Sequence, residues 1–219
     1  MTMKKYLILS AVGLSCLMAA CGGSDKEVQA DTVFTIPDLA SGVYTVSTGS
    51  ESDAVVGKYT VAQDGSRLLY FWDANEKVKT MLSRADGKAA WKLIYGKPES
   101  SSLTFTTSSA KPSALLDPGS ASGSYQMRLA NGDVVEFVID EAGGLQSAAG
   151  TVASCKLQGS ASATPLPNML KMKISAGTCA ALGPDWSGVL VLDSDQKPAA
   201  YRLLSTDATT LRDYWVYRN

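Results

Sequence analysis

The stretch Arg67-Leu68-Leu69-Tyr70-Phe71-Trp72 carries five apolar side chains in succession, and a polar turn, Asp73-Ala74-Asn75-Glu76, follows it. In a strand, successive side chains point to opposite faces, so Leu68, Tyr70 and Trp72 would share one face and the two residues between them the other. A short run that is apolar on both faces and bounded by turn residues is typical of a buried central strand.

Similar short segments lie on both sides of this stretch, separated by Gly, Asn, Asp, Ser and Pro. Met169–Ser175 alternates most clearly, with Leu170, Met172 and Ile174 expected inward and the lysines between them outward. Asn131-Gly132 is a strong hairpin signal. About a dozen short strands at this spacing predict an all-β, antiparallel fold. The other expected strands cover residues 41–48, 55–61, 78–82, 89–95, 103–107, 134–140, 152–160, 186–193, 198–205 and 211–217.

Composition shifts divide the chain after residue 20 into four parts. Residues 38–107 form an N-terminal β group, and the Ser- and Pro-rich residues 108–121 are expected to be a linker. Residues 122–219 form a C-terminal β group, while the small, polar residues 21–37 are typical of a flexible tether. The pattern leaves open whether the β groups form one antiparallel meander, closed as a barrel or sandwich, or two small subdomains of about six strands each.

The N-terminus has the pattern of a secretory signal. Lys4 and Lys5 precede an apolar run from Tyr6 to Met18, which is shorter than the ~20 residues of a spanning helix. The run closes on Leu17-Met18-Ala19-Ala20-Cys21, with Leu one place earlier than usual. This segment resembles the lipobox of a bacterial lipoprotein precursor; the alternative is an ordinary cleaved signal peptide.

The lipoprotein resemblance implies that residues 1–20 are removed and that Cys21 carries acyl chains such as palmitate. The chain would then be anchored to a membrane of the cell envelope, with more than one acyl chain making the attachment stable. Gly22 stands where an Asp would retain the protein at the inner membrane, so the resemblance favours the outer membrane and leaves its periplasmic or surface face open.

The mature part loosely resembles small proteobacterial lipoproteins of unassigned function. The resemblance rests on Ser41-Gly42-Val43-Tyr44, its echo at Ser122-Gly123-Ser124-Tyr125, and a late cysteine pair. That pair, Cys155 and Cys179, is what remains once Cys16 and Cys21 are assigned to the signal and the lipid. In an oxidising envelope compartment we expect a disulfide between them; a redox dithiol would prefer Cys-x-x-Cys spacing.

Composition excludes several classes of chemistry. The chain has no histidine, which rules out Ser-His-Asp and Cys-His sites and imidazole-ligated metal. A net charge of −1, with 20 basic and 21 acidic residues, argues against nucleic acid as a partner. No pattern indicates a cofactor, a metal site or catalytic residues, so we expect a protein that is not an enzyme.

The remaining candidates for function are aromatic. Tyr70, Trp72, Trp91 and Trp186 lie in or beside expected strands and could face a ligand, although filling the core is the simpler role. We therefore expect a lipid-anchored envelope protein with a non-catalytic binding or structural role and an envelope or extracellular protein as partner. The first alternative is a carrier of a small apolar ligand in an aromatic-lined β-barrel; a histidine-free hydrolase using carboxylates is a remote one.

Overall fold

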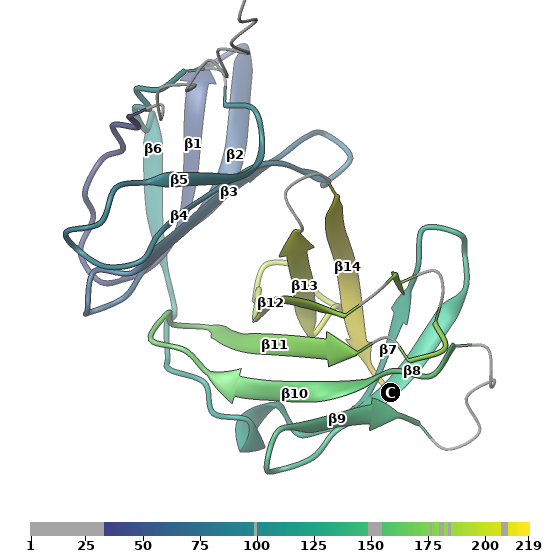
Figure 1. Cartoon of the computed structure of the whole chain (residues 1–219). Helices are drawn as coiled ribbons and strands as arrows, with labels where there is room; N and C mark the ends of the chain where they lie inside the picture. The colour runs from purple at the N-terminus through teal and green to yellow at the C-terminus, as the bar shows by residue number, and fades with distance from the viewer. Residues whose placement is uncertain are drawn as a thin grey trace, which may run out of the picture. The chain divides into compact units, whose positions relative to one another are not determined.

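The part of the chain that the computed structural model describes contains fourteen strands and a short 3₁₀ helix at Gly119–Ala121. This part comprises residues 33–98, 100–148, 155–175, 177–179, 182–183, 185–206 and 210–219. The predicted signal peptide and Cys21 lie outside it, whereas Thr32–Asn219 form one unit. The expected all-β antiparallel fold is confirmed (Figure 1). In the described part, no helix is long and apolar enough to cross a bilayer.

The first six strands form one antiparallel sheet in the order β5-β4-β3-β2-β1-β6. Their consecutive pairing through short turns makes a meander from β1 to β5, and β6 returns to the far side of β1. The sheet consists of β1 (Gly42–Ser50), β2 (Asp53–Val61), β3 (Arg67–Trp72), β4 (Val78–Arg84), β5 (Lys92–Gly96) and β6 (Thr107–Lys111).

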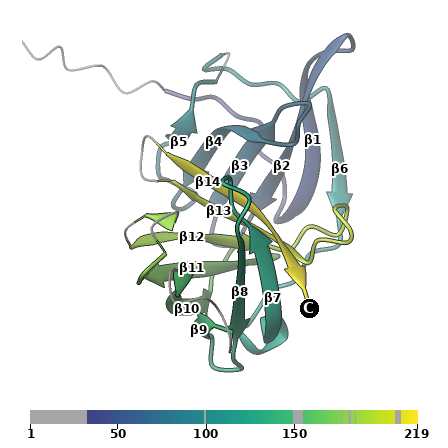
Figure 2. The same ribbon diagram turned by 90° about the vertical axis from the view of Figure 1, so that its right-hand side faces the viewer.

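The last eight strands close into an antiparallel barrel in the order β10-β11-β12-β13-β14-β7-β8-β9, with β9 pairing back to β10 (Figure 2). A 3₁₀ turn, η1 (Gly119–Ala121), precedes the barrel. Its strands are β7 (Gly123–Arg128), β8 (Val134–Ile139), β9 (Gly144–Ser147), β10 (Gln158–Ala163), β11 (Met169–Ser175), β12 (Trp186–Val191), β13 (Tyr201–Thr206) and β14 (Leu211–Arg218).

Strand β3 has the central, two-sided burial that its sequence predicts. It pairs with β2 on one side and β4 on the other. Leu69 and Phe71 pack in a cluster on one face of the sheet, whereas Leu68 and Tyr70 pack on the other face against barrel residues. The barrel side of that contact is supplied by Met169, Val191 and Leu204.

The barrel core follows the alternation predicted for Met169–Ser175. Leu170, Met172 and Ile174 are buried inside the barrel, and Lys171 and Lys173 are exposed. Met169 is also buried, on the side that meets the sheet. Strand β11 is therefore covered on its outer face at one end only.

The strand expected at 152–160 is observed at Gln158–Ala163, and two segments beside the sheet also differ from expectation. The strand expected at 103–107 lies instead at Thr107–Lys111, because Leu103 and Phe105 turn inward to cover the sheet cluster. Strand β6 thus occupies the first residues of the expected linker. The end of the expected tether is also packed: Phe34 and Ile36 lie against the same cluster, and Thr35 forms backbone hydrogen bonds with Ser101 and Leu103.

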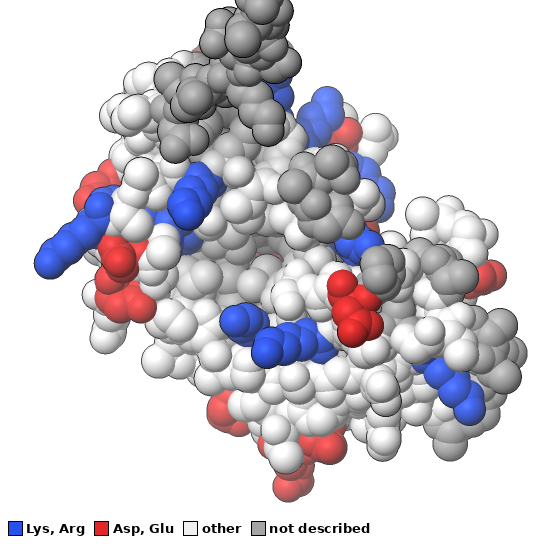
Figure 3. All heavy atoms as spheres, in the orientation of Figure 1, with Lys and Arg blue, Asp and Glu red and all other residues white. Residues whose placement is uncertain are grey.

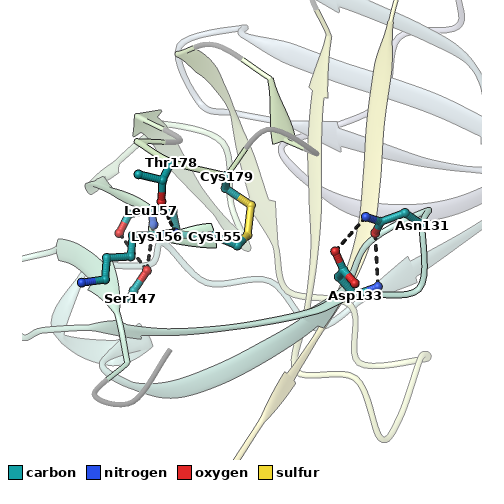
Figure 4. The surroundings of a disulfide bond; sticks show 8 residues. All are labelled: Asn131, Asp133, Ser147, Cys155, Lys156, Leu157, Thr178 and Cys179. Atoms are coloured by element: carbon teal, nitrogen blue, oxygen red, sulfur yellow. Dashed lines mark hydrogen bonds between the residues drawn. A yellow bond between two sulfur atoms is a disulfide. The ribbon is translucent and has the colours of Figure 1, made fainter. Parts of the chain in front are cut away.

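Cys155 and Cys179 form a disulfide, as expected (Figure 4). Beside it, the Lys156 amide donates to Thr178 Oγ1 at 3.0 Å, and the Leu157 amide donates to Ser147 Oγ at 2.7 Å. Cys179 is buried in the barrel core and Cys155 packs against it. The disulfide ties the segment before β10 to the segment after β11.

Candidate functional site

A cleft of about 870 Å³ opens in the six-stranded sheet. We call it the sheet cleft. It lies at the end of the sheet formed by the β1–β2 and β3–β4 connections and is closed on one side by residues 97, 98, 100 and 102–104. Its volume is within the range of small-molecule sites. Its apolar lining includes Val55, Phe71, Trp72 and Leu103.

The floor of the sheet cleft depends on a glycine. Gly57 of β2 stands directly across from Phe71 of β3. A Cβ at Gly57 would lie 2.6 Å from Phe71 Cδ1 and 2.5 Å from the Tyr70 carbonyl oxygen. Because no side chain stands at position 57, the Phe71 ring can lie across the neighbouring strand, an arrangement that covers a strand glycine with an aromatic ring.

Polar groups surround this floor. Asp53, Glu76, Lys79 and Lys97 supply charges of both signs to the lining. Thr80 Oγ1 donates to the Lys97 carbonyl at 3.1 Å, which fixes the closing loop against β4. An apolar floor with a few polar groups around it is the usual constitution of a small-ligand site.

The turn from Asp73 to Lys77 forms one wall of the sheet cleft. Asp73 Oδ1 accepts hydrogen bonds from the amides of Asn75 and Lys77, at 2.9 and 3.0 Å. The Lys77 amide bond contributes most to lowering the pKa of the Asp73 carboxyl. Glu76 has a φ of 59°, an uncommon conformation outside glycine. The conformation of this wall is therefore fixed by hydrogen bonds.

Arg202 of the barrel stabilises this wall through a hydrogen bond. Arg202 is buried and donates to both carboxylate oxygens of Asp213, each at 2.7 Å. It also donates to the Glu76 carbonyl, and the Val78 amide donates to Asp213 Oδ2 at 3.0 Å. Burial acts to lower the pKa of Arg202, but the hydrogen bonds and charge of Asp213 outweigh it and raise that pKa.

Aromatic rings surround the same guanidinium. Arg202 Cζ lies 4.5 Å from the centroid of Trp215, 5.8 Å from that of Tyr70 and 5.9 Å from that of Trp72. Such contacts are favourable because the negative ring face attracts a cation. Trp72 therefore contacts Arg202 and also lines the sheet cleft.

The structure brings together two of the four aromatic residues that the sequence singles out. The rings of Tyr70 and Trp72 are 6.0 Å apart, and Trp72 alone of the four lines the sheet cleft. Trp91 is buried in the sheet cluster, 6.0 Å from Tyr59, and Trp186 is buried in the barrel core. Trp91 and Trp186 therefore lie at separate places in the core.

The barrel interior holds its own aromatic cluster. Tyr125 stacks on Phe137 with centroids 5.7 Å apart and meets Tyr201 edge-on at 5.8 Å. Tyr125 donates to the Ala121 carbonyl at 2.7 Å, and burial raises the pKa of Tyr201 to about 12. An eight-stranded barrel is just wide enough to be filled by its side chains or to hold one small ligand. The closed barrel and its aromatic cluster agree with the architecture of the carrier alternative.

Carboxylates gather at one other place. Lys58 forms ion pairs with Asp193 at 3.0 Å and Asp195 at 2.9 Å, and Lys111 pairs with Asp195 at 3.0 Å. Hydrogen bonds from Lys58 and Lys111 lower the pKa of Asp195 to about 2. A catalytic acid requires the opposite shift. Across the described residues, no group of three or more Cys, Asp or Glu side chains is placed to hold a metal ion.

Sequence patterns do not reveal several residues that shape the sheet cleft. Phe71 and Leu103 resemble ordinary core residues. Arg202 and Asp213 are far in sequence from the wall that they support. The available signal is a charge inside an apolar strand: Arg202 stands in Tyr-Arg-Leu-Leu, and Asp213 in Arg-Asp-Tyr-Trp. Buried charges of this kind need a partner.

The charge distribution on the face drawn in Figure 3 does not indicate a partner. On the face drawn in Figure 3, basic and acidic side chains are interspersed, without a large area of one sign. Comparison with known proteins adds no assignment, since no protein-family model, no curated protein and no solved structure matches this chain.

Proposed function

We propose that this chain is a lipid-anchored protein of the cell envelope that binds a small amphipathic ligand in the sheet cleft without transforming it. The observation that carries the binding role is the cleft itself: about 870 Å³, with Phe71 at its apolar floor, Trp72 elsewhere in its lining, and Lys79 and Lys97 around it. An apolar ligand body would cover the rings while its polar groups meet the lysines.

The membrane role is supported by the N-terminal sequence. Acylation at Cys21 would place the binding domain at a membrane surface, where amphipathic molecules are concentrated. The buried aromatic residues and the disulfide suit a domain that works in an oxidising compartment.

A cleft-filling variant tests the binding role. Ala54 is exposed and lines the sheet cleft, so Ala54→Trp should fill it. We expect this variant to reduce binding of the neutral fluorescent probe N-phenylnaphthylamine at least about tenfold while remaining folded. Ala85→Trp, at an exposed position in the β4–β5 connection, is the matched control and should bind normally. Equal binding by both variants would contradict the cleft as the site.

A cysteine substitution tests the anchor. Cys21→Ser should move the protein from the membrane fraction to the soluble fraction and remove any fatty acid from its intact mass. Cys16→Ser, inside the predicted signal, should leave both unchanged. Membrane retention by the Cys21→Ser protein would rule out acylation as the anchor.

A second candidate keeps the ligand inside the barrel, and the cluster of Tyr125, Phe137 and Tyr201 favours it. The ligand would have to displace side chains that now pack there, so we expect weak uptake. Phe137→Ala would open space and should raise uptake of the same probe if the barrel is the site. Unchanged uptake by Phe137→Ala, together with loss in Ala54→Trp, assigns binding to the sheet cleft.

A further inference from the structure

A second hollow, of about 520 Å³, lies between the outer face of barrel strand β14 and strands β4 and β5 of the sheet. We call it the aromatic groove. Val216 of β14 is fully buried in the barrel core. Trp215 and Tyr217 therefore stand on the outer face, where both line the groove. It shares no lining residue with the sheet cleft.

Four half-buried aromatic residues line the groove: Tyr95 of β5 and Tyr214, Trp215 and Tyr217 of β14. Trp215 and Tyr217 are two residues apart on one strand, which places their attachment points about 6.8 Å apart along it. The guanidinium of Arg202 lies 4.5 Å from the centroid of Trp215 and helps to fix that ring. The groove thus offers successive ring surfaces in a row.

The charge at the groove is positive. Lys77 and Arg128 line it, both are exposed, and within the described part of the chain neither forms an ion pair. Asp213 also lines the groove, but its carboxylate accepts hydrogen bonds from Arg202 and from the Val78 amide. Its negative charge is therefore compensated locally, while the two cations remain available.

We infer that the aromatic groove binds an acidic oligosaccharide. Aromatic faces attract the C–H groups of sugar rings, because the ring face is negative and the C–H hydrogens are weakly positive. Two ring platforms in a row suit a ligand made of successive rings. The guanidinium of Arg128 matches the planar geometry of a sugar carboxylate and can donate two parallel hydrogen bonds to it.

Single-stranded nucleic acid also combines rings with negative charge, but the groove has only two available cations and the whole chain is slightly acidic. Binding of nucleic acid depends on a larger set of phosphate contacts. Oligonucleotide binding is therefore an outcome that would count against the inference.

The test titrates the purified full-length chain with tetragalacturonic acid and follows tryptophan fluorescence and heat. The neutral maltotetraose and a deoxythymidine oligonucleotide are titrated in parallel. We expect binding of the acidic sugar that weakens as salt rises, at least about tenfold weaker binding of the neutral sugar, and no comparable binding of the oligonucleotide. Equal affinity for both sugars, tighter binding of the oligonucleotide, or no binding of any probe would overturn the inference.

Two exposed-site variants connect the signal to the groove. Arg128→Met should weaken binding of tetragalacturonic acid about tenfold, because it removes the charge-assisted hydrogen bonds and leaves the strand pairing of β7 intact. Lys171→Met removes an exposed cation from β11, outside the groove, and should bind like the unmodified chain. Equal loss in both variants would mean non-specific charge attraction and would overturn the assignment. Ala54→Trp should not affect binding of tetragalacturonic acid. The proposals for the aromatic groove and for the sheet cleft can therefore be contradicted independently.

Discussion

Lys58 of the sheet and Asp193 of the barrel form an ion pair, with Nζ and Oδ1 3.0 Å apart and side chains only 7% and 3% exposed. Both charges have been removed from water, and Asp193 lies in the connection after β12. Removing one partner of such a pair leaves an uncompensated buried charge, which is more costly than the pair itself. The contact between sheet and barrel therefore includes a buried carboxylate, Asp193, that depends on Lys58 for its countercharge, whereas Lys58 also pairs with Asp195.

Lys58→Met should lower the free energy of unfolding by about 3–5 kcal/mol, because Asp193 would stay buried without its cation. Denaturant unfolding measures the loss. The double variant Lys58→Met/Asp193→Leu should be more stable than Lys58→Met, since it removes the stranded carboxylate. A Lys58→Met protein within about 0.5 kcal/mol of the unmodified chain, the usual effect of a surface change, would contradict this.

Arg202→Met should destabilise the protein by a similar amount, about 3–5 kcal/mol. Asp213 would lose its two hydrogen bonds from Arg202, and the Glu76 carbonyl would lose its donor. Thermal and denaturant unfolding report the change. Lys79→Met is the control: Lys79 is 67% exposed and lies 4.0 Å from Asp73, so its loss should cost less than about 1 kcal/mol.

Gly57→Val should destabilise the protein by about 1–3 kcal/mol and weaken probe binding in the sheet cleft. The new side chain would collide with Phe71 and with the Tyr70 carbonyl. Unfolding and N-phenylnaphthylamine titration measure the two effects. At Gly87 a Cβ would meet nothing closer than 3.8 Å, so Gly87→Ala should change neither by a measurable amount.

Replacing both disulfide cysteines by serine should lower the free energy of unfolding by about 3 kcal/mol. Cys155 and Cys179 are 24 positions apart in sequence, and the bond between them restricts the unfolded chain by closing this loop. Intact mass before and after reduction verifies the bond. If reduction leaves the thermal unfolding temperature of the unmodified protein unchanged, the bond contributes nothing to stability.

Low pH should weaken the ion pairs that Asp195 forms with Lys58 and Lys111. Its folded pKa of about 2 lies below the ~3.9 of an unfolded aspartate, so its ionised form is stabilised by folding. The contribution is complete above pH ~4 and disappears as pH falls toward about 2. Because its side chain is 39% exposed, solvent screening keeps it near or below about 1 kcal/mol. Between pH ~5 and ~2, the free energy of unfolding should fall less steeply with decreasing pH for Asp195→Asn than for the unmodified chain. The same pH dependence in both proteins would contradict the assignment.

The sequence predicts the strands whose burial is local and periodic. Arg67–Trp72 and Met169–Ser175 begin and end where expected, and Asn131-Gly132 turns the chain between β7 and β8. Strand β6 is different: four of its five residues are exposed, so no apolar alternation marks it, and only its pairing with β1 makes it a strand.

The candidate site could be predicted only in part. Trp72 stands out as an aromatic residue, but Gly57 and Phe71 become a floor only when β2 and β3 pair in one register. The hydrogen bond from Arg202 to Glu76 spans 126 residues, and that from Lys58 to Asp195 spans 137. Contacts so distant leave no spacing pattern in one sequence, because they depend on how the sheet and the barrel meet.

The order of the strands also determines through which edges copies of this protein can associate. In the part of the chain that the structure describes, every barrel strand has two neighbours, whereas β5 and β6 each leave one side of their backbone unpaired. Unpaired strands are where foreign chains add and fibres start. At high protein concentration, neighbouring copies would therefore associate through the sheet rather than the barrel, and proline substitutions in β5 or β6 should suppress this aggregation.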